Sequence, residues 1–308
     1  MPPPQPNIPG AIAFMLLATV FIGGTMILAK ALQSDVLGPA LPAFQVSHAR
    51  FLFAFLAISM VAAVMRPRFE RPRLRLHLMR ASFGWVGVTC MFASVAFIPV
   101  SDATALTFLN PVFAMALAIP FLGERVGPYR WLAAGIALVG ALILLRPGPG
   151  TFQPAALLAL GSAMFFGAEI ICVKLLSSRE GAFQILLVNN AIGLTLASIA
   201  VSFVWQSPTA AQWAAMAGIG IVMATAQAMY VNAMSRAEAS LIVPFSYGTL
   251  VFATLYDALF FDVLPDAVSW TGAGVIIAGA LLLAWREARA ARPAALRPVA
   301  TKGTSGLD

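Results

Sequence analysis

The stretch WLAAGIALVGAL at residues 131–142 returns as WTGAGVIIAGAL at residues 270–281. Both copies begin with Trp, are apolar almost throughout and end in Gly-Ala-Leu. Recurrence of a whole apolar segment at a fixed place in two halves of a chain is typical of an internal repeat. The sequence therefore predicts two copies of one structural unit.

Two further pairs of stretches support the duplication. Lys30 follows Phe21-Ile22-Gly23 at the same spacing at which Lys174 follows Phe165-Phe166-Gly167. Ser101-Asp102-Ala103-Thr104 corresponds to Ala237-Glu238-Ala239-Ser240. The repeat thus covers several segments of each half.

The composition indicates that the solvent of this chain is lipid. Of its 308 residues 60% are hydrophobic and 10% charged, and the mean hydropathy is +0.89. One helical crossing takes about 20 apolar residues. We predict an all-α integral membrane protein of ten transmembrane helices, at residues 9–32, 42–65, 77–98, 101–123, 128–146, 154–176, 182–204, 211–235, 239–261 and 267–286.

Each predicted repeat holds five helices, so the second copy enters the membrane from the opposite side. The expected units are a five-helix repeat at residues 1–150, an inverted five-helix repeat at residues 151–287, and a basic tail at residues 288–308 that we expect to be disordered. Inverted repeats with a site at their interface are a recurring plan of secondary transporters.

The basic residues predict the orientation. They gather in the connector after the second helix and in the tail, and positive connectors stay in the cytoplasm. We expect a multi-pass protein of the inner (cytoplasmic) membrane with both termini cytoplasmic. The net charge of +7 and the pI near 10.1 then reflect topology and not nucleic-acid binding. The basic residues concerned are Arg66, Arg68, Arg71, Arg73, Arg75, Arg80, Arg286, Arg289, Arg292, Arg297 and Lys302.

The chain resembles the EamA family of the drug/metabolite transporter superfamily. The residues that carry the resemblance are Gly23 to Lys30, Arg50, Asn110-Pro111, Leu122-Gly123-Glu124-Arg125 and the two Trp-to-Gly stretches. Ile22 replaces the family's usual aromatic, and Phe261-Asp262 replaces the second Gly-Glu. The resemblance implies export or uptake of small organic molecules, with amino-acid exporters a large subset of the bacterial members.

Glu169 is the first candidate for substrate binding. It lies well inside a predicted helix, two residues after Gly167, where a carboxylate facing lipid would cost several kcal/mol. It is expected to face the bundle interior, where it binds an ammonium group or a coupling proton, or else ties helices together.

Arg50 and Trp85 each have two interpretations. Arg50 either reaches the headgroups with its long side chain or binds a substrate carboxylate in bidentate fashion. Trp85 either anchors the third helix at the interface or stacks on the substrate.

The lysines at equivalent positions of the two copies are expected to form gating ion pairs, Lys30 with Asp102 and Lys174 with Glu238. The alternative is that both lysines extend to the headgroups.

Polar residues beside helix prolines or on one helix face are further path candidates. A proline inside a membrane helix frees a carbonyl that protein or water must satisfy. Gln227 and Tyr230 share a helix face because they are three residues apart. The full set is Asn110, Ser246, Tyr247, Gln227 and Tyr230.

The sequence favours a secondary transporter, first of all an amino-acid exporter. The alternatives are a carrier of a nucleoside-like, vitamin-like or cationic drug-like compound, and a channel. No enzyme, catalytic residue, cofactor or metal site is expected, since His48 and His77 lie far apart and Cys90 and Cys172 are isolated in apolar segments. The expected partners are a small-molecule substrate, membrane lipid and a coupling proton, with no oligomer required.

Overall fold

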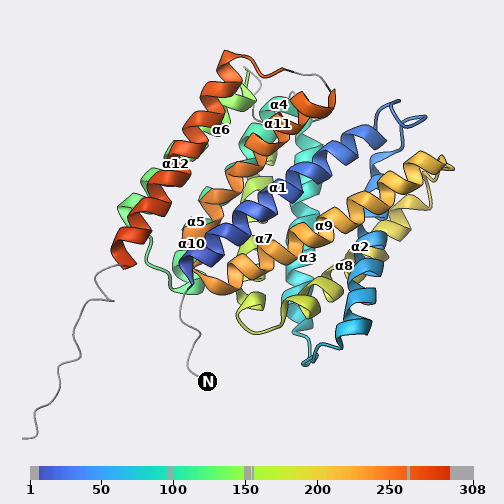
Figure 1. The fold of residues 1–308 in the computed structure, drawn as a ribbon, viewed down its shortest axis with the longest axis horizontal. Coiled ribbons are helices and arrows are strands. Elements are labelled where there is room, and N and C mark those ends of the chain that lie inside the picture. Colours follow the sequence, from blue (N-terminus) through green and yellow to red (C-terminus); the bar gives the residue numbers. More distant parts are fainter. Residues whose placement is uncertain are drawn as a thin grey trace, which may run out of the picture.

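The computed structural model describes residues 7–95, 97, 100–148, 154, 156–261 and 264–291, and within them every regular element is a helix (Figure 1). The predicted all-α fold class is confirmed for this part of the chain. The elements are α1 (Ile8–Leu32), α2 (Ala43–Met65), α3 (Leu74–Val95), α4 (Val100–Thr107), α5 (Asn110–Leu122), α6 (Pro128–Leu145), α7 (Ala156–Ser177), α8 (Ala182–Val201), α9 (Ala210–Arg236), α10 (Ala239–Ile242), the 3-10 helix η2 (Val243–Tyr247), α11 (Gly248–Phe261) and α12 (Ala267–Ala291).

Eight segments of the described chain are long and apolar enough to cross a membrane, and α5 is a shorter apolar helix. The chain is therefore a multi-pass membrane protein. The eight are α1, α2, α6, α7, α8, α9, residues 239–261 and Ala267–Arg286. Ten crossings would also need α3 and the α4–α5 pair, and that count stays a prediction.

Two helices predicted as continuous are interrupted. The segment 101–123 is divided where α4 ends at Thr107 and α5 begins at Asn110, and the segment 239–261 is divided into α10, η2 and α11. Pro111 and Pro244 lie in the first turn after each break. Proline lacks an N–H and clashes with the preceding turn, so it is tolerated at a helix start and breaks a helix interior.

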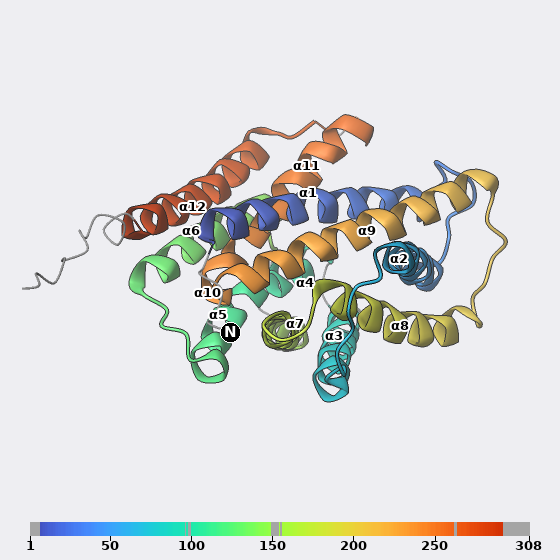
Figure 2. The same cartoon turned by 60° about the horizontal axis from the view of Figure 1, so that its bottom comes forward.

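The two repeated stretches, residues 131–142 and 270–281, pack against each other. They lie on α6 and α12, which run side by side in Figures 1 and 2. A Cβ on Gly140 would lie 2.7 Å from the backbone nitrogen of Ile276, and one on Gly279 would lie 3.0 Å from the carbonyl oxygen of Ala133. Small residues allow this close approach, which van der Waals packing between membrane helices requires.

The first helices of the two predicted repeats have matching neighbours. α1 packs on α9 and α11, and α7 packs on α3 and α5. A Cβ on Gly23 of α1 would lie 3.2 Å from Cβ of Phe252, and a Cβ on Gly167 of α7 would lie 2.9 Å from Cβ of Phe113. Both glycines are thus required for the distance between their helix and its partner.

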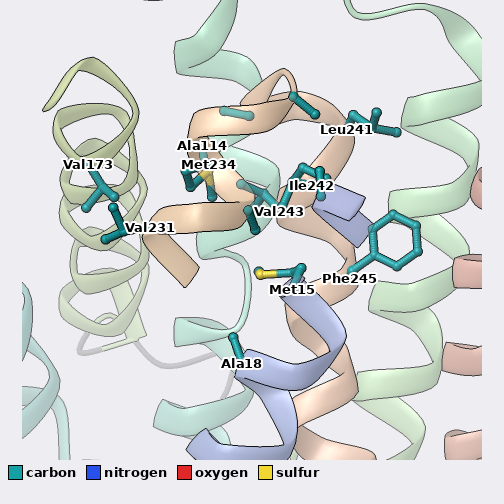
Figure 3. Close-up of a cluster of buried hydrophobic side chains, with 14 of the residues drawn as sticks. Met15, Ala18, Ala114, Val173, Val231, Met234, Leu241, Ile242, Val243 and Phe245 are labelled. Carbon is teal, nitrogen blue, oxygen red and sulfur yellow. The ribbon is translucent and has the colours of Figure 1, made fainter. Parts of the chain in front are cut away.

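A cluster of buried apolar side chains closes one end of the bundle around α10 (Figure 3). Met15 of α1, Val173 of α7 and Met234 of α9 meet Leu241 of α10 and Phe245 of η2, and each is less than about a twentieth exposed. This end of the bundle is densely packed between the two halves of the chain.

Candidate functional site

An ion pair connects α3 and α7. The Nε of Arg80 lies 3.4 Å from Oε1 of Glu169, and the two side chains are 7% and 29% exposed. Among the described residues, the buried Nη1 of Arg80 has no hydrogen-bond partner. A buried guanidinium N–H without an acceptor is costly, so this group can gain from an acceptor brought by a ligand or by a change of conformation.

Local helix geometry places Glu169 beside Arg80. Arg80 and Gly84 are four residues apart, so they share one face of α3. A Cβ on Gly84 would lie 3.3 Å from Oε2 of Glu169, and a Cβ on Gly87, one turn further, would lie 2.9 Å from the ring of Phe166. Gly84 thus leaves room for the Glu169 carboxylate, and Gly87 leaves room for the ring of Phe166.

Arg50 of α2 and Tyr230 of α9 complete this group. Both interact electrostatically with Glu169 and Arg80, and the guanidinium carbon of Arg50 lies 3.9 Å from the centroid of the Phe51 ring. We call Arg50, Arg80, Glu169 and Tyr230 the polar centre. Its members come from four helices, and it carries two cations and one carboxylate.

Three of its members were candidates from the sequence, and Arg80 was not. Arg80 was expected in a connector, as a topology signal, whereas it lies inside α3 and is 6% exposed. Its position in the first turns of an apolar run was the available signal. A buried charge in a membrane helix is a functional candidate by default.

Gln227 is held by a partner that the sequence did not single out. The buried Asn190 of α8 donates from Nδ2 to Oε1 of Gln227 at 3.0 Å and to the carbonyl of Leu186 at 2.8 Å. Its Oδ1 is buried without a partner in the described part of the chain. Because Gln227 shares a face of α9 with Tyr230, this amide pair lies on the same face as the polar centre.

Asn110 has a backbone role at the break between α4 and α5. Pro111 has no N–H to donate to the carbonyl of Thr107, and the Nδ2 of Asn110 donates to that carbonyl at 2.9 Å. Asn110 thus satisfies the acceptor that Pro111 frees.

Tyr247 has the same role at the next carbonyl. The backbone N–H of Val112 bonds to Leu109 and leaves the carbonyl of Phe108 without a helical donor. The hydroxyl of Tyr247 donates to that carbonyl at 2.9 Å, and the two rings stack. Because Tyr247 is fully buried, it lines no open path in this conformation.

Ser246 and Trp85 are each partly accessible. Ser246 is half-buried in η2. Trp85 is 46% exposed, so its ring lacks the enclosure expected of a stacking platform. Its role as an interfacial anchor stays a prediction.

Lys30 forms an ion pair, and its partner is Asp257. The Nζ of Lys30 lies 2.5 Å from Oδ1 of Asp257, with side chains 45% and 35% exposed, and 4.3 Å from the centroid of the Phe261 ring. The side chain of Asp102, the predicted partner, lies outside the described residues.

The ammonium group of Lys174 contacts backbone carbonyls, and its predicted ion pair with Glu238 stays a prediction. The Nζ of Lys174 donates to the carbonyls of Met234 and Ala237, at 2.6 and 2.5 Å. The last carbonyls of a helix lack hydrogen-bond donors inside the helix. Those at the end of α9 accept hydrogen bonds from the Lys174 ammonium group. Glu238 pairs with Arg130.

Three transporters are similar to this chain over most of its length. A riboflavin transporter of Rhizobium johnstonii is 33% identical over 222 residues, which cover 70% of this chain and 72% of the relative. An S-adenosylmethionine uptake transporter of Rickettsia bellii is 26% identical over 263 residues, or 85% and 90%. A pseudopaline exporter of Pseudomonas aeruginosa is 25% identical over 248 residues, or 79% and 86%.

Fold and family comparisons agree with these relatives. A protein of known crystal structure matches with a TM-score of 0.75 at 19% identity, over 90% of this chain and 98% of the other, and so shares the fold. The sequence pattern of the EamA-like transporter family matches residues 9–146 and again residues 153–285. The chain therefore belongs to the EamA-like transporter family and is a membrane transporter.

Proposed function

We propose that this protein is a secondary transporter that binds a small organic metabolite at the polar centre. The observation that carries the proposal is Arg80, a buried guanidinium with an unpartnered N–H, beside the carboxylate of Glu169 and in the field of Arg50. Guanidinium groups recognise carboxylates and planar acceptor edges. Four different helices meet there, so a bound substrate would be sensitive to their relative movement.

The first candidate substrate is a vitamin-like compound such as riboflavin. Two relatives are riboflavin transporters, and the one from Rhizobium johnstonii is 33% identical to this chain. The carbonyl edge of an isoalloxazine ring offers the acceptors that Arg50 and Arg80 can bind, and Tyr230 offers an aromatic surface for stacking.

An amino acid is the second candidate, because the polar centre has both signs of charge. Its carboxylate would bind Arg50 or Arg80, and its ammonium group would bind Glu169. Transport measured with both classes of compound distinguishes the two candidates.

The test is counterflow in proteoliposomes with radiolabelled riboflavin and radiolabelled amino acids. A carrier exchanges labelled for unlabelled substrate, whereas a channel passes it without exchange. Glu169→Gln should abolish exchange while the protein stays folded and inserted, because the amide is nearly isosteric and removes only the charge. Transport by the wild type should depend on pH if Glu169 also carries a coupling proton. Unchanged transport by Glu169→Gln would contradict the proposed site.

For the architecture we propose ten crossings in two inverted repeats. Three observations support this: the matching neighbours of α1 and α7, the equivalent contacts of Gly23 and Gly167, and the interruption of both predicted helices 101–123 and 239–261. Interrupted helices in corresponding positions of two repeats are typical of transporter sites.

We propose that the protein lies in the inner membrane. In the proposed orientation, both termini are in the cytoplasm. Single cysteines at the exposed positions Ser207 and Ser178 test it. A membrane-impermeant thiol reagent should label Ser207→Cys in intact cells and Ser178→Cys only after lysis. The reverse pattern would overturn the orientation.

A further inference from the structure

The aromatic ring under Arg50 depends on a glycine of the neighbouring helix. The Phe51 ring lies against α8, where a Cβ on Gly193 would lie 2.2 Å from Cε1 and 2.4 Å from Cδ1 of that ring. Carbon atoms in contact are about 3.5–4.0 Å apart. Any side chain at position 193 must therefore displace the ring.

The ring position in turn sets the position of the guanidinium. Arg50 lies 3.9 Å above the Phe51 centroid, and a cation is held over a ring face by the ring quadrupole, more strongly where water is excluded. We propose that Gly193 is a positioning residue of this transporter: by leaving room for Phe51, it holds Arg50 at the polar centre. This inference rests on the proposed function, because it takes Arg50 as a substrate-binding residue.

Gly193 differs in this respect from a glycine that only sets helix spacing. On α9, a Cβ at Gly220 would meet the backbone of α2 as well as a side chain, at 2.8 Å from the nitrogen of Ala54. At Gly193 the three nearest atoms all belong to the Phe51 ring. A methyl group at 193 should therefore turn the ring before it moves the helix, and its effect should appear in substrate affinity.

The test is transport in proteoliposomes with radiolabelled riboflavin and a radiolabelled amino-acid mixture as probes. Gly193→Ala should raise KM by about tenfold, the size of a partly desolvated cation–π contact, with little change in Vmax. The matched control is Gly161→Ala, whose Cβ would meet nothing within 4 Å. Because Gly193 acts through Arg50, Gly193→Ala should add nothing to the effect of Arg50→Ala.

The outcomes separate this inference from the proposed function. An unchanged KM in Arg50→Ala removes Arg50 from the substrate site, and both proposals then fail at this residue. If Arg50→Ala raises KM but Gly193→Ala does not, or if Gly193→Ala has its full effect without Arg50, only the positioning role is overturned.

A second measurement needs no substrate. The fall in unfolding temperature caused by Gly193→Ala should largely disappear when Phe51→Leu removes the ring, because the clash is then gone. An equal fall in both backgrounds would show that Gly193 does not act through Phe51, and it would overturn the inference.

Discussion

Lys30 and Lys174 occupy equivalent positions in the two copies of the repeat, yet their surroundings differ. Lys30 pairs with Asp257 in a setting where both side chains are more than a third exposed. Lys174 is half-buried and donates to two carbonyls at the end of α9. Duplication has preserved the cation at each place but not its partner.

The difference extends to the two ends of the bundle. The Lys30 end also holds the exposed pair of Arg146 with Asp266, and one hollow is lined by Arg146, Asp257 and Asp266. At the Lys174 end, the buried carboxylate of Glu124 accepts hydrogen bonds from the first N–H groups of α10. In this conformation the Lys174 end is therefore the more densely bonded one, and we expect the Lys30 end to need less free energy to open.

The largest expected effect comes from removing the ammonium group of Lys174. Lys174→Met leaves the carbonyls of Met234 and Ala237 without a donor and should lower the free energy of unfolding by about 1–3 kcal/mol. Lys30→Met should lower it by less than about 1 kcal/mol, because the pair with Asp257 is exposed. Chemical denaturation in detergent measures both, and equal losses would contradict the comparison.

The next effect concerns the carboxylate at the same end. Both oxygens of Glu124 accept backbone hydrogen bonds, from Ala239 at 2.7 Å and from Ser240 at 2.9 Å. Glu124→Gln keeps one acceptor oxygen and loses the charge, so unfolding should become easier by about 1–2 kcal/mol. Asp257→Asn is the matched change at the Lys30 end, and a larger loss there would reverse the assignment of the more densely bonded end.

Helix extents follow from the sequence because apolar length and bounding prolines determine them. The predicted segment 128–146 corresponds to Pro128–Leu145, and 9–32 corresponds to Ile8–Leu32. The interruptions at Thr107 and Val243 were not predicted, although the nearby prolines indicated freed carbonyls. A proline shows that a carbonyl loses its helical donor, but only the tertiary fold supplies the replacement, here Asn110 and Tyr247.

For the candidate site, the sequence identified isolated charges better than pairings. Glu169 and Arg50 stand out because each is a charge within an apolar run, whereas Arg80 is masked by the other arginines of its connector. Asp257 is 227 residues from Lys30, so the choice of partner depends on how α11 packs on α1. No local spacing encodes that contact.

The third prediction concerns how stability depends on pH through the contacts of Glu180, which lies near the Lys174 end. Glu180 lies between α7 and α8. Burial raises its pKa, but hydrogen bonds from the backbone of Arg73 and from His77 and Gln184 outweigh burial and leave the pKa below its ordinary value of 4.5. A depressed folded-state pKa stabilises the protein above the unfolded value, and this contribution is lost as pH falls through the folded pKa.

Unfolding temperature should therefore fall below about pH 4.5, and Glu180→Gln should flatten this part of the profile. The contact with His77 is buried, and the Nε2 of its ring lies 3.0 Å from Oε2 of Glu180. An unchanged acid profile in Glu180→Gln would show that the contact contributes nothing to the pH dependence.

The smallest effect is expected at the Lys30 end, from Asp266. Its side chain pairs with Arg146 and accepts a hydrogen bond from the backbone of Ser269 at 2.9 Å, and these contacts lower its pKa from 3.8 to about 2. The sign is the same as for Glu180, so the stabilisation is present above pH 3.8 and is lost as pH falls toward 2. The Asp266 side chain is 52% exposed, however, and salt screens exposed pairs. Asp266→Asn should thus change the unfolding temperature less than any variant above, and the remaining difference should disappear in concentrated salt.

A loss from Asp266→Asn that persists in salt and matches that of Lys174→Met would mean that both ends are equally closed. The contrast between the two lysines would then say nothing about which end opens.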